Sequence, residues 1–64
     1  MALKLRVPTL KDQQSAQELK ELIHTSESGA DVEIDVQSKT VTIESKASEE
    51  TFRELIVSAG HSIE

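Results

Sequence analysis

The spacing of apolar residues changes repeatedly along this chain, and the order of those changes limits the folds that it can adopt. Alternation at every second residue, which is typical of half-buried strands, occurs over residues 3–7, 32–36 and 40–44. A spacing of three to four residues, which is typical of amphipathic helices, occurs over residues 13–24 and 49–59. Residues 61–64 then leave room for a short strand, so the predicted order is βαββαβ.

Residues with helix-end preferences mark the ends of both predicted helices. Asp12 precedes the first helical stretch, and an aspartate at that position accepts hydrogen bonds from amides that would otherwise be unpaired. Ser48 precedes the second stretch and is followed by Glu49 and Glu50, whose negative charge complements the helix dipole. Gly60 is a typical helix-ending residue. We therefore predict that Asp12 and Ser48 are N-caps.

These elements are expected to pack as two layers, because each helix has one apolar stripe and each strand has one apolar face. Right-handed crossovers place the second hairpin strand beside the first strand and the last strand on its other side. We therefore predict an α+β, ferredoxin-like βαββαβ fold with two helices on a four-stranded antiparallel-type sheet. Residues 1–64 are expected to form a single domain, since a chain of this length builds only one core.

The net charge disfavours several classes of ligand. Seven basic and twelve acidic residues give a net charge of −5, which opposes approach to nucleic acid and to anionic membrane surfaces. Phe52 is the only aromatic residue, so there is no platform on which bases could stack. Protein partners with basic faces and metal cations remain as reasonable ligands.

The small size of the chain argues against catalysis. Most apolar side chains are needed for the core, so a deep substrate cleft and an enzymatic activity are not expected. No apolar run approaches the ~20 residues of a membrane span, and the N-terminus has no signal-peptide pattern. We therefore expect a cytoplasmic protein without membrane insertion.

Several segments carry a family resemblance. They read LRVPTL at residues 5–10, VEIDV and KTVTI at 32–36 and 39–43, and SAGH at 58–61. Together they resemble the heavy-metal-associated domains of copper chaperones and of metal-transporting ATPases over the whole chain. His61 after the Ala-Gly pair resembles the small cyanobacterial copper chaperones in particular. The resemblance implies the ferredoxin-like fold and a role in metal ion transport or homeostasis.

The first loop departs from the motif of that family. Family members carry M-x-C-x-x-C there, and two thiolates bind copper(I) because this soft cation prefers sulfur. Leu10, Asp12 and Ser15 occupy the three motif positions here, and the sequence contains no cysteine. We therefore expect that the copper(I) site is absent and that Leu10 keeps only the packing role of the methionine.

His61 is the other residue that the resemblance places near the first loop, where it could face Asp12. Such a pair could be a structural contact, a pH-sensitive contact or two thirds of a weak zinc or copper(II) site, since zinc accepts nitrogen and oxygen ligands. Ser15 is the weakest candidate ligand. His24 is expected to be solvated at the far end of the first helix, about 18 Å away at 1.5 Å per residue. No firmly bound cofactor is expected.

The expected function is that of a copper-chaperone-like module that docks to a protein or regulates it in metal homeostasis. The resemblance implies docking through the loop end and the exposed helix faces, which selects Lys11, Gln14, Glu18, Glu21 and His61. The implied partners are a soluble domain of a metal-transporting ATPase or a paralogous chaperone. The alternative is a weak zinc or copper(II) carrier that uses Asp12 and His61. A monomer or a weak homodimer is expected.

Overall fold

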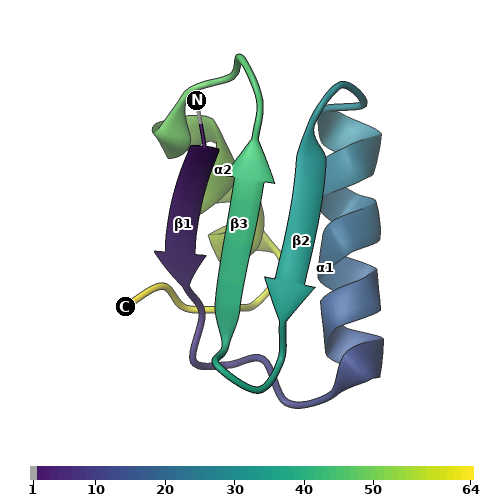
Figure 1. Ribbon diagram of the computed structural model, residues 1–64, viewed down its shortest axis with the longest axis vertical. Helices are drawn as coiled ribbons and strands as arrows, with labels where there is room; N and C mark the ends of the chain where they lie inside the picture. Colours follow the sequence, from purple (N-terminus) through teal and green to yellow (C-terminus); the bar gives the residue numbers. More distant parts are fainter. Residues whose placement is uncertain (1) are drawn as a thin grey trace.

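The computed structural model describes residues 2–64 and contains three strands and two helices in the order β1, α1, β2, β3, α2 (Figure 1). Their bounds are Ala2–Arg6 for β1, Gln13–Ser26 for α1, Asp31–Asp35 for β2, Thr40–Glu44 for β3 and Glu49–Ser58 for α2. The sheet order is β1-β3-β2, and both strand pairs are antiparallel. Both helices lie on one side of the sheet, so the predicted helix-on-sheet arrangement is confirmed (Figure 1).

The structure corrects the predicted fourth strand. Residues 61–64 adopt no strand conformation; the segment passes behind the sheet, and only its end reaches the outer side of β1 (Figure 1). A single backbone hydrogen bond joins them to β1, from the Glu64 amide to the Arg6 carbonyl oxygen at 2.9 Å. An antiparallel pair needs repeated bonds at alternate residues. The segment does not continue the ladder because His61 and Ser62 bond to Thr9 in the first loop instead.

Twelve buried apolar side chains form one core between the sheet and the helices. They are Leu5, Val7, Leu10, Ala16, Leu19, Ile23, Ala30, Val32, Val41, Ile43, Phe52 and Ile56. The predicted stripe of α1 is confirmed, since Ala16, Leu19 and Ile23 are all buried. Neither α1 nor α2 has the combination of length and hydrophobicity that a membrane crossing requires.

The second strand is shifted by one residue from its predicted bounds, since β2 spans Asp31–Asp35 and not residues 32–36. Val36 was expected to continue the second strand, but β2 ends at Asp35. The Asp35 side chain stabilises a turn directly after β2, because its Oδ1 accepts hydrogen bonds from the amides of Gln37 at 3.0 Å and Ser38 at 3.4 Å. Lys39 then completes the turn in a left-handed conformation with φ of 58°. This turn lies at the same end of the sheet as the first loop.

Candidate functional site

Asp12 is the N-cap of α1, as predicted. Its Oδ1 accepts a hydrogen bond from the Ser15 amide at 2.9 Å. In return, the Ser15 Oγ accepts a hydrogen bond from the Asp12 amide at 3.3 Å and donates one to the Asp12 carbonyl oxygen at 2.9 Å. This reciprocal arrangement is a capping box, with serine in place of the usual Glu or Gln. The two residues at the family's cysteine positions are therefore bound to each other.

Replacing the cap is expected to separate a structural role of Asp12 from a role of its charge. Asp12→Ala should lower the free energy of unfolding by about 0.5–2 kcal/mol, because it leaves the Ser15 amide without its side-chain acceptor. Asp12→Asn and Asp12→Ser should lower it much less, since both keep a capping oxygen. Denaturant unfolding of the three variants measures this order. Equal losses in all three would instead indicate a role that needs the negative charge.

The β2–β3 turn holds the first loop from the other side. The Lys39 Nζ donates a hydrogen bond to the Leu10 carbonyl oxygen at 2.6 Å, and the Lys39 carbonyl oxygen accepts one from the Val7 amide at 2.8 Å. The left-handed backbone of Lys39 costs about 1–2 kcal/mol, and these two contacts help to offset that cost. Leu10 is fully buried beneath the loop, which confirms its predicted packing role.

The end of α2 directs His61 toward this loop. Gly60 adopts a φ of 91°, which glycine reaches without strain. Its amide donates to the Val57 carbonyl oxygen at 3.0 Å, and the His61 amide donates to the Ile56 carbonyl oxygen at 3.2 Å. This pair of bonds is a Schellman motif, and it fixes the direction in which the chain leaves the helix.

His61 contacts Thr9 rather than Asp12. The His61 Nδ1 lies 2.7 Å from the Thr9 Oγ1, which also accepts a hydrogen bond from the Ser62 amide at 3.2 Å. His61 is therefore at the loop end of the molecule, as predicted. The ion pairs within residues 2–64 are Arg6 with Glu64 and Arg53 with Glu49, so none joins Asp12 to His61.

The arrangement offers little to a metal ion. Nowhere in residues 2–64 do three or more His, Asp or Glu side chains gather in a way that could hold one. The Asp12 carboxylate is engaged in capping, and the His61 Nδ1 is engaged with Thr9. His24 lies in the last turn of α1, at the opposite end of that helix from Asp12. The two proposed ligands are thus near one end of the molecule but serve separate structural contacts.

The predicted docking residues form a strip along α1. Lys11, Gln14, Glu18 and Glu21 are all exposed. Gln14, Glu18 and Glu21 are spaced three or four residues apart and share one face of α1, and Lys11 lies in the loop just before the N-cap. We call these four residues the α1 strip. His61 is half-buried and lies near the end of the α1 strip that is next to the first loop. The strip thus combines one basic residue next to the loop with two acidic residues farther along the helix.

Two residues that hold the site were not singled out from the sequence. Thr9 is bonded to His61 across 52 positions of sequence, and Lys39 is bonded to Leu10 across 29. The hydroxyl of Thr9, next to Pro8 in a loop that His61 was expected to approach, is the signal that could have identified the first contact. Nothing in the local pattern around Lys39 indicates the second.

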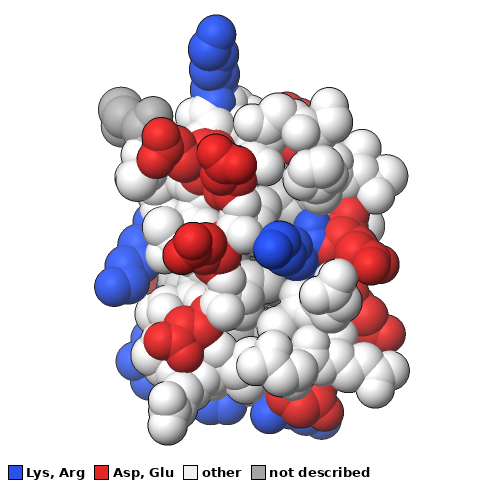
Figure 2. All heavy atoms as spheres, turned by 45° about the vertical axis from the view of Figure 1, so that its right-hand side comes forward, with Lys and Arg blue, Asp and Glu red and all other residues white. Residues whose placement is uncertain are grey.

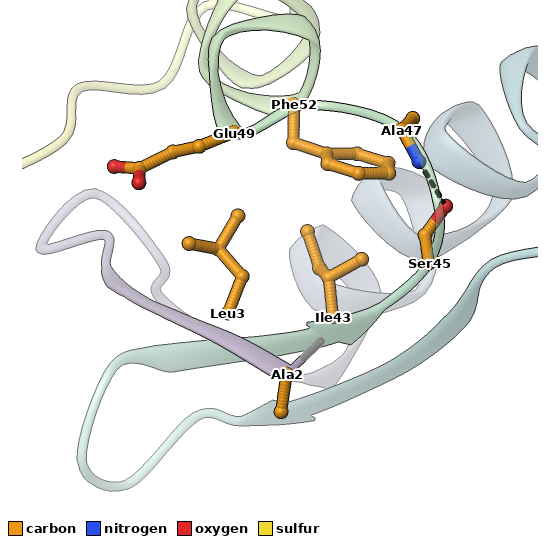
Figure 3. Close-up of a pocket in the computed structure, with 7 residues that line it drawn as sticks. All are labelled: Ala2, Leu3, Ile43, Ser45, Ala47, Glu49 and Phe52. Carbon is orange, nitrogen blue, oxygen red and sulfur yellow. Dashed lines mark hydrogen bonds between the residues drawn. The ribbon is translucent and has the colours of Figure 1, made fainter.

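A small cavity lies at the other end of the sheet. It has a volume of about 90 Å³, and its walls include Leu3, Ile43 and Phe52, which Figure 3 shows pointing toward one another. Ligand pockets usually have about 300–1,000 Å³ and a few convergent polar groups. The polar side chains Glu49 and Ser45 lie at its margins. The cavity is therefore a packing feature of the core and offers no reaction site.

Comparison with known proteins adds to this geometry. No protein-family model and no curated protein matches the chain. Among solved structures, the Cu2 form of the copper chaperone Atx1 from Synechocystis has a TM-score of 0.90 and 37% identity, over 97% of this chain and 98% of that chain. The cyanobacterial copper metallochaperone ScAtx1 in solution has a TM-score of 0.83 and 38% identity, over 100% of both chains. A gold binding protein has a TM-score of 0.87 at 21% identity, over 95% of this chain and 97% of that chain, which is a likeness of fold alone.

The copper chaperones match in sequence as well as in fold, and they match from one end of the chain to the other. The absence of cysteine sets this chain apart from the M-x-C-x-x-C pattern, while the overall fold remains that of the copper chaperones. The chain therefore belongs to the family of Atx1-type copper chaperones with the heavy-metal-associated fold, as a member that contains no cysteine.

Proposed function

We propose that this protein acts in metal homeostasis as a docking or regulatory module that binds a protein partner and carries no copper(I). The observation that supports this most strongly is the capping box between Asp12 and Ser15 at the two cysteine positions. Copper(I) favours soft sulfur ligands, and a carboxylate and a hydroxyl do not replace them. The substitutions produce a well-capped helix start in place of a thiolate pair.

The α1 strip and the loop beside it are the surface that we assign to the partner. The loop is held in place by buried Leu10, by the Lys39 contact and by the contact of Thr9 with His61. A rigid loop end is a suitable docking surface, because little conformational freedom is lost on binding. The partner is a soluble domain of a metal-transporting ATPase or a paralogous copper chaperone. Occupying such a partner without delivering copper would make the protein a competitor of copper-carrying relatives.

Zinc or copper(II) binding by Asp12 and His61 would be limited to the atoms that their structural contacts do not use. The Asp12 Oδ1 caps α1 and the His61 Nδ1 contacts Thr9, so a metal ion would have to bind the second carboxylate oxygen and the Nε2. Two ligands from one chain would also leave a tetrahedral zinc shell half filled. The contacts of both side chains therefore favour the docking role over the carrier role.

Titration of the ¹⁵N-labelled protein with the soluble domain of a metal-transporting ATPase, and separately with a cysteine-containing chaperone, tests the docking role. Amide shifts are expected along the α1 strip and at His61. The double variant Glu18→Lys with Glu21→Lys should weaken binding by about tenfold or more, which is about 1.4 kcal/mol, because it removes the acidic part of the strip.

A matched variant, Glu33→Lys with Glu44→Lys, makes the same charge change on the opposite face of the sheet and should leave binding unchanged. No shift with either partner, or equal weakening by both double variants, would contradict the docking role. Adding zinc to the same samples distinguishes the carrier role from the docking role. Selective zinc-induced shifts at His61 and around Asp12 would support a carrier, whereas shifts scattered over the acidic surface would indicate nonspecific binding.

A further inference from the structure

The sheet has an open face, turned away from both helices, on which charge is ordered across the strands. The register aligns a basic residue of β1, a threonine of β3 and an acidic residue of β2 in each of two rows. The first row is Lys4, Thr42 and Glu33, and the second row is Arg6, Thr40 and Asp35. Side chains alternate between the faces of a strand, and buried Leu5 and Val32 point to the helices, so these six residues point to the open face. One margin of the open face is therefore basic and the other is acidic.

Most of these charges have no partner within one molecule. Lys4 and Glu33 are separated by the width of β3, which is about 10 Å at a strand spacing of ~4.8 Å. Neither they nor Asp35 take part in an ion pair within residues 2–64, and Arg6 pairs with Glu64 at 2.7 Å. Thr40 and Thr42 line a shallow depression of about 260 Å³ between the charged margins. Figure 2 shows a column of acidic side chains down the left half of the view, with basic side chains at its left edge.

We propose that the open face binds a second copy of this chain. In this dimer two open faces lie on each other, and the two-fold axis between them runs parallel to β3. Each row then lies over the same row of the second copy. The basic margin of one copy lies over the acidic margin of the other. Lys4 then lies over Glu33 of the second copy and Arg6 over its Asp35, and each pair occurs twice because the interface is isologous. A third row, of Ala2, Glu44 and Asp31, lies at the end of the face, where Glu44 meets Glu44 of the second copy in a single repulsive contact. A two-fold axis across the strands would instead lay the basic margin on the basic margin. The charge pattern therefore selects one orientation, compatible with the aligned packing of two sheets.

This association is weak. Three strands of five residues span roughly 17 Å by 10 Å, well below the ~800 Å² that each partner contributes to a stable interface. The net charge of −5 on each copy also opposes association. At about 0.15 M salt the Debye length is about 8 Å, so the repulsion between whole molecules is largely screened while pairs in contact are screened less. We expect a dissociation constant on the order of 0.1–1 mM. The interface lies opposite the α1 strip, so it does not depend on the proposed function.

Charge reversal at the two margins tests this interface. Lys4→Glu and Glu33→Lys should each weaken self-association by about tenfold or more, because each change turns both copies of the central pair into a repulsive contact. An equimolar mixture of the two variants should associate at least as well as the wild type, since every Lys4–Glu33 contact between unlike variants is again of opposite charge. Sedimentation equilibrium, with amide shifts on dilution from about 1 mM, measures both effects.

Two control variants make the same charge changes away from the open face. Lys46→Glu, in the β3–α2 connection, and Glu54→Lys, on α2, are both exposed and should leave self-association within about twofold of the wild type. Thermal unfolding of each variant verifies that it is folded. Equal weakening by the controls would overturn the proposal, as would a mixture of Lys4→Glu and Glu33→Lys that stays monomeric. Absence of wild-type association at about 1 mM would also overturn it.

Discussion

Replacing Asp12 and Ser15 together by cysteine is expected to create a copper(I) site that binds one equivalent. The two side chains occupy the N-cap and third positions of α1 and already contact each other, so two sulfur atoms there would lie close together. The start of a helix favours the thiolate form of cysteine. Thiolates are the ligands that copper(I) prefers. The overall fold is that of the family, and in this chain Leu10 is buried beneath the loop and His61 contacts Thr9.

Competition with a copper(I) chelator measures this gain, and the single variants Asp12→Cys and Ser15→Cys are the controls. Each single variant should retain far less copper than the double variant, because one thiolate cannot chelate. The double variant should also lose about 0.5–2 kcal/mol of unfolding free energy with the cap. A folded double variant that retains no more copper than the single variants would show that the loop is no longer arranged as a metal loop.

Phe52→Ala is expected to unfold much of the protein at room temperature. Phe52 is the only aromatic residue and is 1% exposed. Truncating a buried phenylalanine costs about 3–5 kcal/mol, whereas a chain of this length has a total stability of only about 3–10 kcal/mol. The ring also forms a wall of the 90 Å³ cavity (Figure 3), so its removal enlarges a space that is already unfilled.

Val57→Ala, on the same helix, is the control for this variant. Val57 is 58% exposed, so its truncation should change the free energy of unfolding by no more than about 0.5 kcal/mol. Urea unfolding followed by circular dichroism measures both variants. Similar losses at Phe52 and Val57 would mean that the core is not organised around the aromatic ring.

The helices and their caps could be predicted from sequence because their determinants are local. The N-cap at Asp12 depends on an amide three residues away, and the stripe of α1 repeats within a few turns. The hairpin was also predicted, apart from Val36. The chain turns at that point because the Asp35 side chain accepts hydrogen bonds from two following amides.

The contacts between distant segments could not be predicted in the same way. The sequence placed His61 near the first loop, but only the Schellman motif at Gly60 and the position of Thr9 decide which side chain it meets. The prediction of a fourth strand was not confirmed, for the same reason. Residues 61–64 are too few for their alternation of apolar and polar side chains to predict whether they pair with β1 or bond to a loop. In the structure, the Ser62 amide donates a hydrogen bond to the Thr9 hydroxyl in the first loop. The Lys39 contact depends on a left-handed turn residue that no local signal marks.

Copper(I) competition on the wild-type protein tests most directly whether the family's metal loop has become a capped helix start. A chelator of known affinity is mixed with the wild type and copper(I), with the variant that has cysteine at positions 12 and 15 in parallel, while amide signals of the loop are recorded. The copper is expected to stay with the chelator at every ratio, and the Asp12 and Ser15 amides of the wild type are expected not to shift. Stoichiometric retention of copper(I) by the wild type, with shifts of those amides, would contradict this.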